Sequence, residues 1–365
     1  MSEDLEVVGV TKKMLRQILN KNAYWKDDIA PLPRSKASWL ILNDRISEED
    51  YCGVIAKENK KMVAFIYMFP DLINTHHTEA KKAYWMNNWW VHEKYKDSVL
   101  GTYIYNQAIK LTKNQVLIKG YTENVEEFYS KLPFTVIASR FRYTLFFSLD
   151  YSMLIGRFKS LNKIKFLVKI LDALTGKVVR FINSKRLRNK TSDISYDYIN
   201  ELDDDTWAFI KPLCENDLIY KTKAYISWQI SKTQYLQIPL RHKVAYKNLN
   251  TGISNNIHIH NLKIIKNHKI IGFLSYVINF NEFNVKYFLV GDKKNYELCV
   301  DVLMEHLIKS KRNFIFTDDS ELSKNITRRY VTVYTHKVLK KGLVHNDTKF
   351  DYNSVNMLNR DGHFY

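Results

Sequence analysis

Cysteine and long apolar runs are scarce in this chain of 365 residues. The three cysteines, Cys52, Cys214 and Cys299, are far apart and lack paired spacing, which argues against a disulfide framework or a structural zinc site. No apolar run reaches the length that spans a bilayer. The acidic N-terminal residues do not resemble a secretory signal. We therefore expect a protein of the reducing cytoplasm.

Several catalytic motifs are also missing. The sequence has no Gly-x-Ser-x-Gly nucleophile elbow, no Walker loop and no dinucleotide-binding fingerprint, which argues against those enzyme classes. His76 and His77 have no nearby cysteine or paired carboxylate, and His258 and His260 fit a strand beside solvent. No metal ion is therefore expected.

Positive charge, in contrast, is abundant. Lys and Arg number 56 against 38 Asp and Glu, which gives a formal net charge of +18. Such an excess favours a polyanionic partner, which could be nucleic acid, an anionic membrane or a phosphorylated substrate. Abundant Lys, Asn, Ile and Tyr is also typical of proteins encoded by AT-rich genomes. The distribution of the charge is therefore more informative than its total.

Half of the excess charge lies in residues 150–190, which contain eleven bases and only two acids, Asp150 and Asp172. Apolar residues at spacings of three and four predict an amphipathic helix here, with an apolar stripe and a basic opposite face. One interpretation is an interdomain helix that packs on a core and leaves its lysines in solvent. The alternatives are contact with an anionic membrane surface and, less favoured, contact with nucleic acid.

Periodicity before residue 150 predicts an alternation of strands and helices. The expected elements are strands at 5–10, 52–56, 62–69, 85–91 and 115–120, helices at 11–21, 99–112 and 123–130, an irregular segment at 24–47, and a final strand pair at 134–138 and 141–149. Thr11 fits the N-cap of the first helix.

The stretch from Trp85 to Phe134 is the most informative part of the chain. Its Trp-rich strand is followed by a turn and by a helix that begins near Val99. This order places backbone N–H groups at a helix N-terminus directly after a strand. Such a helix start favours an anion, because its first N–H groups lack intrahelical partners and the helix dipole is positive there.

This stretch resembles the acyl-CoA-binding core of the GNAT (GCN5-related) N-acyltransferases. Their usual pattern is Val-x-Pro-x-Tyr-Arg-Gly-x-Gly-x-Gly, then a helix, a strand and a Phe-Tyr-x-Lys-x-Gly-Phe ending. The matching positions are Val91, Tyr95, Lys96 and Gly101 in the first part and Phe128, Tyr129, Lys131, Leu132 and Phe134 in the ending. Asp97 and Val99 stand where the family prefers Gly, and Pro133 replaces the Gly of the ending. Asp97 puts a negative charge beside the expected pyrophosphate.

The resemblance implies acetyl-CoA or another acyl-CoA as co-substrate and direct attack on its thioester. The residues that it assigns to acyl-CoA binding are Val91, Lys96, Asp97, Ser98, Val99, Leu100, Gly101 and Thr102. Tyr129 falls on the position of the acid that protonates the departing thiolate; the alternative is a half-buried residue that closes the helix against the sheet. His92 has a suitable intrinsic pKa for the base, although a turn histidine is commonly just solvated, and Asn88 lies near the strand end where the acyl group would lie.

From about residue 195 the sequence predicts a weaker copy of the same order of elements. Its third strand is followed by Gly291-Asp-Lys-Lys-Asn, which has no Gly-x-Gly. The expected fold class is α/β (α+β), with two GNAT-like domains, each a mixed, mostly antiparallel twisted sheet flanked by helices. The expected divisions are an acyl-CoA-binding domain at 1–149, a basic connecting segment at 150–194 and a degenerate domain at 195–365.

The leading functional hypothesis is an acyl-CoA-dependent N- or O-acyltransferase, which transfers acetyl to an amine or hydroxyl of a small molecule or sugar. The basic segment favours a phosphorylated or lipid-linked acceptor, and a cytoplasmic protein that is peripheral to the inner membrane face. One alternative is a tRNA-dependent aminoacyltransferase of the cell-wall type. The position of the intact motif in the first copy argues against it. The other alternative is a GNAT scaffold that binds without catalysis.

Overall fold

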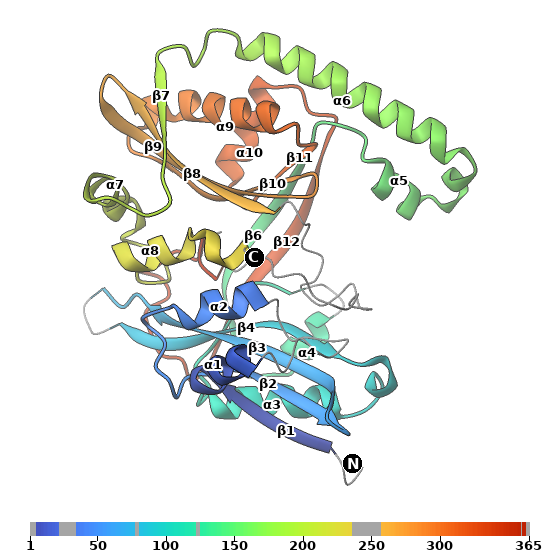
Figure 1. The fold of residues 1–365 in the computed structure, drawn as a ribbon, viewed down its shortest axis with the longest axis vertical. Coiled ribbons are helices and arrows are strands. Elements are labelled where there is room, and N and C mark those ends of the chain that lie inside the picture. Colours follow the sequence, from blue (N-terminus) through green and yellow to red (C-terminus); the bar gives the residue numbers. More distant parts are fainter. Residues whose placement is uncertain are drawn as a thin grey trace. The chain divides into compact units, whose positions relative to one another are not determined.

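The computed structural model describes residues 5–21, 34–76, 80–121, 125–235, 257–358 and 360–362. Contacts between residues divide the chain into two compact units (Figure 1). The first unit comprises Met1–Ser139, Glu215–Asn255 and Lys340–Tyr365, and the second unit comprises Arg140–Cys214 and Asn256–Leu339. These divisions differ from the predicted ones, because two later segments return to the first unit. Periodicity reports local structure only and does not say which unit a later segment rejoins.

The first unit is built on a mixed, mostly antiparallel sheet with the strand order β1-β2-β3-β4-β5-β12. The strands are β1 Leu5–Thr11, β2 Tyr51–Glu58, β3 Lys61–Ile73, β4 Lys81–Val91, β5 Val116–Ile118 and the end of β12 Tyr334–His345. Strands β4 and β5 pair in parallel, so a crossover connection must join them. Helix α3 (Leu100–Leu111) is that crossover.

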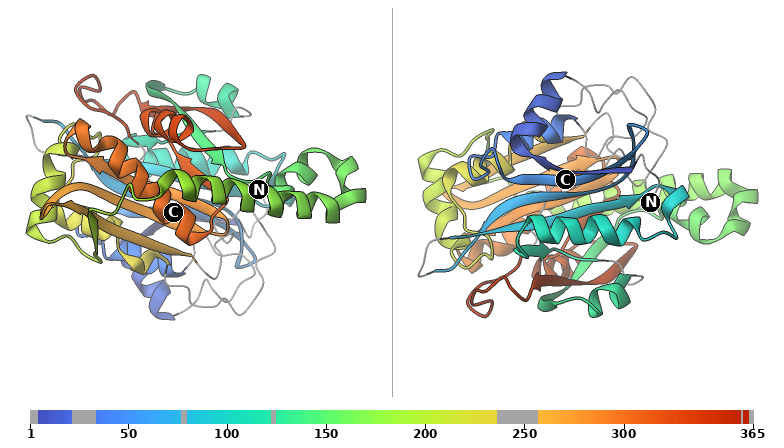
Figure 2. Two further views of the ribbon diagram at one scale, coloured as in Figure 1. Left: turned by 90° about the horizontal axis from the view of Figure 1, so that it is seen from above. Right: turned by 90° about the horizontal axis from the view of Figure 1, so that it is seen from below.

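The other helices of the first unit are α1 Lys12–Lys21, α2 Arg34–Ile41, α4 Glu126–Ser130 and α8 Lys223–Gln229. Figure 2 (right) shows α1 and α3 on opposite faces of the sheet. Helix α3 buries Leu100, Ile104 and Ala108 in a core cluster with apolar residues of β2, β3 and β4. The start of α3 is therefore fixed against the strand that precedes it.

Local sequence explains the first elements. The N–H group of Met14 donates to Thr11 Oγ1 at 3.3 Å, which confirms Thr11 as the cap of α1. Asn59 and Lys60 both have positive φ, as the two central residues of a tight hairpin between β2 and β3 require. Two predictions were wrong. Part of the segment expected to be irregular forms helix α2, and the expected final strand pair is one continuous strand, β6.

The second unit contains a sheet with the strand order β6-β11-β10-β9-β8-β7. Its elements are the end of β6 Phe134–Phe146, α5 Tyr151–Arg157, α6 Lys165–Leu187, β7 Ile194–Tyr198, α7 Asp204–Ile210, β8 His258–Lys266, β9 Lys269–Asn279, β10 Glu282–Val290, α9 Tyr296–Ser310, β11 Phe314–Thr317 and α10 Ser320–Arg329. Strands β10 and β11 pair in parallel and are joined by α9, so this unit repeats the order β4-α3-β5 of the first unit.

Helix α6 packs on the second unit through a narrow stripe that consists of Val168, Asp172, Gly176, Val179, Asn183 and Leu187. Its larger apolar side chains have exposed fractions from 36% to 74%. This outer stripe consists of Phe166, Leu167, Ile170, Leu171, Leu174, Val178, Phe181 and Ile182. The apolar stripe that was expected to pack on a core therefore faces solvent. In the described ranges, no helix combines the length and apolar character needed to cross a membrane.

Candidate active site

Strand β4 is irregular at Asn88 and Trp89. The register between β3 and β4 shifts between Phe65 and Tyr67, so these two residues of β4 oppose a single residue of β3. Such a β-bulge leaves a backbone N–H group outside the ladder. Asn88 has a φ of +50°, in the left-handed region that Asn tolerates better than most residues. The bulge can therefore present a backbone donor to a ligand.

Beyond the bulge, β4 ends at Val91 and the chain turns into helix α3, which has Gly101 in its first turn. A Cβ atom on Gly101 would lie 3.2 Å from Val91 Cγ2 and 3.3 Å from Trp89 Cζ2. The glycine thus allows the first turn of α3 to press against the bulged strand. This contact brings the helix N-terminus next to the end of β4.

The start of α3 is suited to an anion. A helix start leaves N–H groups without intrahelical acceptors, and the first turn of α3 contains no acidic residue. Ser98 Oγ accepts from the N–H group of Leu100 at 3.2 Å. The N–H groups of the first turn, which include those of Gly101 and Thr102, suit an external acceptor such as a phosphate oxygen.

The other predicted loop residues lie on the surface. Lys96, Asp97 and Val99 are exposed. The Lys96 ammonium pairs with Glu93 at 3.4 Å across two exposed side chains, a contact that contributes little energy. The structure therefore brings Val91 and Gly101 together at the strand–helix junction and leaves the charged loop residues in solvent.

His92 serves as a cap. Its Nδ1 atom accepts a hydrogen bond from the N–H group of Lys94 at 3.1 Å, at the start of the short 3-10 helix Glu93–Tyr95. In the neutral ring the proton then resides on Nε2, so neither nitrogen can accept a proton while this cap is kept. The arrangement gives His92 a structural role, and its role as the base stays a prediction.

Tyr129, on α4, belongs to an aromatic cluster that reaches the bulge. Its ring centroid lies 5.4 Å from that of Phe128 and 6.2 Å from that of Tyr105 on α3. Trp89 lies 5.1 Å from Tyr105 and 5.2 Å from Phe128. Burial raises the pKa of Tyr129 to about 12. The phenol therefore keeps its proton at neutral pH, as a donor to a departing group must.

Two buried donors at the bulge lack partners. Asn88 Nδ2 and Trp89 Nε1 have no hydrogen-bond partner among the described residues. Because an unpaired buried donor is costly, such atoms indicate a place where a ligand can accept hydrogen bonds. The carbonyl oxygens of an acyl-CoA are such acceptors, and its phosphates suit the start of α3. The residues present therefore fit an acyl-CoA, with the Asp97 carboxylate as an opposing charge.

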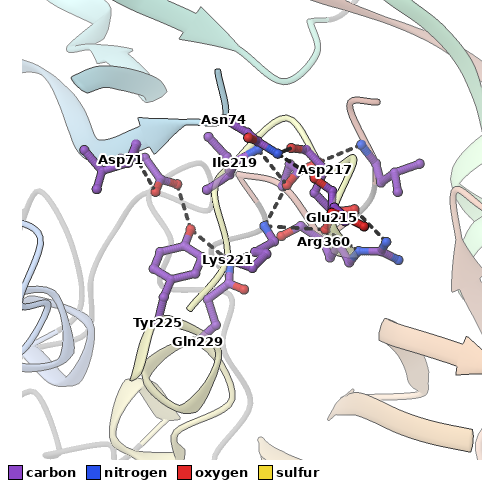
Figure 3. A network of polar contacts seen from close by, with 12 residues as sticks. Asp71, Asn74, Glu215, Asp217, Ile219, Lys221, Tyr225, Gln229 and Arg360 are labelled. Carbon is purple, nitrogen blue, oxygen red and sulfur yellow. Dashed lines mark hydrogen bonds and ion pairs between the residues drawn. The ribbon is translucent and has the colours of Figure 1, made fainter. Parts of the chain in front are cut away.

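The first unit also contains a buried network of polar side chains that was not predicted from the sequence (Figure 3). Asp71 of β3 accepts from Trp85 Nε1 at 3.1 Å and from the hydroxyl of Tyr225 at 2.7 Å. Arg360 donates to both carboxylate oxygens of Asp217 at 2.6 Å. Trp85 is thus a core residue whose indole nitrogen is already engaged.

The carboxylates of this buried network accept hydrogen bonds from other residues of the first unit. The Lys221 ammonium donates to Asp361 at 2.7 Å, and the Asp361 carboxylate also accepts from the N–H group of Leu358 at 2.8 Å. Burial raises the pKa of both Asp71 and Asp217. Each carboxylate has partners within the chain, so the network holds the returning segments on the first unit. Their partners come from segments far apart in the sequence, which is why periodicity gave no sign of them.

Comparisons with protein-family models and with curated protein sequences find no match for this chain. Among solved structures, Saccharomyces cerevisiae N-myristoyltransferase with bound myristoyl-CoA and inhibitors has a TM-score of 0.55 at 14% identity, over 98% of this chain and 88% of that one. The same yeast protein with bound myristoyl-CoA has a TM-score of 0.54 at 11% identity, over 98% and 90%. A GCN5-related N-acetyltransferase from Kribbella flavida has a TM-score of 0.48 at 9% identity, over 94% and 72%.

The similarity to the yeast protein extends over nearly the whole of both chains at very low identity, so it reports on fold. It agrees with the mixed sheet, the parallel pair β4 and β5, and the helix that joins them. The chain has the GNAT fold.

Proposed function

We propose that this protein is an acyl-CoA-dependent N- or O-acyltransferase whose acyl-CoA binds at the β4 bulge and the start of α3. The observation that carries the proposal is the bulge at Asn88 and Trp89, with two buried donors that lack partners in the described part of the chain. The bulge lies next to the start of α3, because Gly101 allows the helix to pack closely against β4. The likeness to yeast N-myristoyltransferase, which binds myristoyl-CoA, supports the proposal.

The proposed reaction is direct attack. The pyrophosphate takes the N–H groups at the start of α3, and the donors of the bulge polarise the thioester carbonyl. An amine or hydroxyl of the acceptor forms a bond to the carbonyl carbon and loses a proton to a base. His92 is the candidate, and it can act only when its Nδ1 atom releases the N–H group of Lys94. The C–S bond breaks, and Tyr129 donates a proton to the departing thiolate.

Acetyl-CoA is the first donor to test, with a small molecule or sugar as the acceptor. The likeness to N-myristoyltransferase adds a long-chain acyl-CoA as a second donor. The two differ in how much apolar chain the site must accept, so affinity for CoA, acetyl-CoA and myristoyl-CoA ranks the possibilities.

Thermal unfolding of the full chain with each of these three ligands tests the proposal. A ligand that binds only the folded state stabilises it by about 2.7 kcal/mol at 100 times its Kd, which is a readily measured shift. A free-thiol assay with a mixture of amines and amino sugars then tests turnover. We expect a shift with at least one acyl-CoA and acceptor-dependent thiol release. The absence of any shift at millimolar ligand would overturn the proposal.

A further inference from the structure

The outer stripe of α6 is a continuous apolar surface on the outside of the second unit. Phe166 is 74% exposed and Phe181 64% exposed, although both are among the residues most often buried. The opposite side of the helix packs on the second unit, where Val179 and Leu187 join its core. Asn183 Nδ2 donates to the Val331 carbonyl at 2.9 Å, and the Val331 N–H group donates to Asn183 Oδ1 at 2.8 Å. The outward orientation is therefore fixed by specific contacts.

The charges beside this stripe are almost all positive. Helix α6 carries six bases and a single acid, Asp172. Asp172 is buried and accepts from the N–H groups of Asp150 and Tyr151 at 2.9 and 3.3 Å, so its charge is turned inward. The Lys185 ammonium lies 5.5 Å from the centre of the Phe181 ring. Exposed apolar side chains thus alternate with bases whose long stems can extend past them.

We propose that the outer stripe of α6 docks this protein on an anionic lipid bilayer, with the helix in the plane of the interface. An apolar face flanked by Lys and Arg is the pattern of an interfacial helix: the apolar side chains enter the acyl boundary and the bases reach the headgroups. Charge complementarity selects this occupant. A second copy of the chain would bring another segment of net charge +9 against the first. The proposal is independent of acyl-CoA binding, which concerns the first unit.

Co-sedimentation of the full chain with sucrose-loaded vesicles tests this proposal. One set of vesicles is phosphatidylcholine alone, and the other contains about one third phosphatidylglycerol. We expect binding to the anionic vesicles that weakens as salt is raised, and at least tenfold weaker binding to the neutral ones. A wild-type chain that stays in the supernatant with anionic vesicles, or that binds both sets equally, would overturn it.

Two variant pairs locate the contact. The double change Phe166→Ser and Phe181→Ser removes apolar surface and should lower partitioning about tenfold or more, whereas Leu42→Ser with Val136→Ser, also at exposed positions, should not. Lys177→Glu should weaken binding to anionic vesicles, and Lys324→Glu on α10 should do so less. Equal losses in test and control variants would contradict the assignment to α6.

Each variant is checked by its melting temperature and by its response to acyl-CoA, which should both stay as in the wild type because the changed side chains face solvent. Light scattering on the free protein tests the alternative occupant of the stripe, which is a second copy of the chain. If the wild type is a dimer and the Phe166→Ser, Phe181→Ser variant a monomer, the stripe is an interface between copies and the membrane proposal fails.

Discussion

The two units each place a helix after an irregular strand, yet the two helix starts differ in charge. Strand β4 bulges at Asn88 and Trp89 before α3, and β10 shifts register between Val285 and Tyr287 before α9. The first turn of α3 has no acid, whereas the first turn of α9 contains Glu297. The backbone arrangement is thus repeated, but the electrostatics are not.

In the second unit, carboxylates lie in and just before the first turn of the helix. Glu297 forms ion pairs with Arg328 and Arg329 of α10. Just before α9, Asp292 accepts from the N–H group of Lys294 at 2.9 Å. These carboxylates occupy the region where an incoming phosphate would need positive potential. Among the described residues, the helix start of the first unit is therefore the better suited of the two to an external anion, in line with the proposal that acyl-CoA binds there.

The glycines show the same division of roles. Gly101 makes room for strand β4 against α3, with Val91 and Trp89 at 3.2 and 3.3 Å from a Cβ. Gly291, which directly follows β10 in the second unit, makes room for the Phe209 ring, 2.7 Å from a Cβ. One glycine shapes a helix start beside a bulge, and the other accommodates a side chain.

The largest effect should come from Gly101→Val. The new side chain must displace Val91 and Trp89, which moves α3 away from the bulge, and overpacking of this kind costs about 1–3 kcal/mol of stability. We expect acyl-CoA affinity, measured by calorimetry, to fall more than 100-fold. Gly156→Val is the control, because a Cβ at Gly156 meets nothing within 4 Å. Retained affinity in Gly101→Val would remove the α3 start from the binding site.

The next largest effect should come from Tyr129→Phe, which keeps the ring and removes the acid. We expect kcat to fall about 100-fold with KM nearly unchanged, because a proton donor acts in the transition state. Tyr121→Phe, whose ring lies 5.0 Å from that of Tyr129, is the matched control.

The pH profile gives an independent check on Tyr129. Its folded pKa is raised to about 12, so the protonated donor persists as pH rises and the rate should show no loss from this group up to about pH 10. A decline with an apparent pKa near 10 that disappears in Tyr129→Phe would contradict the buried environment.

The sequence predicted only part of the difference between the starts of α3 and α9. The strand–turn–helix order around Gly101 identified the first junction, since the motif is local. The bulge could not be identified in this way, because it depends on the register of β4 against β3, which the residue pattern of β4 alone does not specify. The capping bond of His92 also depends on local geometry that side-chain identity alone does not fix. The ion pairs of Glu297 come from α10, about thirty residues later, so no spacing rule would find them.

A smaller effect should come from Asn88. Asn88→Gly and Asn88→Ala both delete the unpaired Nδ2 donor, and loss of one hydrogen bond to the ligand should weaken acyl-CoA binding about tenfold. The two variants separate binding from backbone strain. A positive φ is unfavourable for Ala but not for Gly. The Ala variant should therefore also lose about 1 kcal/mol of unfolding free energy, measured with denaturant, whereas the Gly variant should not. Unchanged affinity in both would remove this donor from the site.

The smallest effect should come from Glu297→Gln in the second unit. Glu297 is half exposed, and Arg329 keeps its bond to Asp301 at 2.7 Å, so the loss of unfolding free energy should stay below about 1 kcal/mol. Calorimetry should still give one acyl-CoA per chain with an unchanged Kd, because α9 has no glycine in its first turn to bring its start against the preceding strand as Gly101 does for α3. A second bound acyl-CoA would mean that the Glu297 carboxylate alone prevents binding at the second unit. A stoichiometry of one means that a strand irregularity before an acid-free helix start is not enough, and that the packing of Gly101 against β4 is also needed.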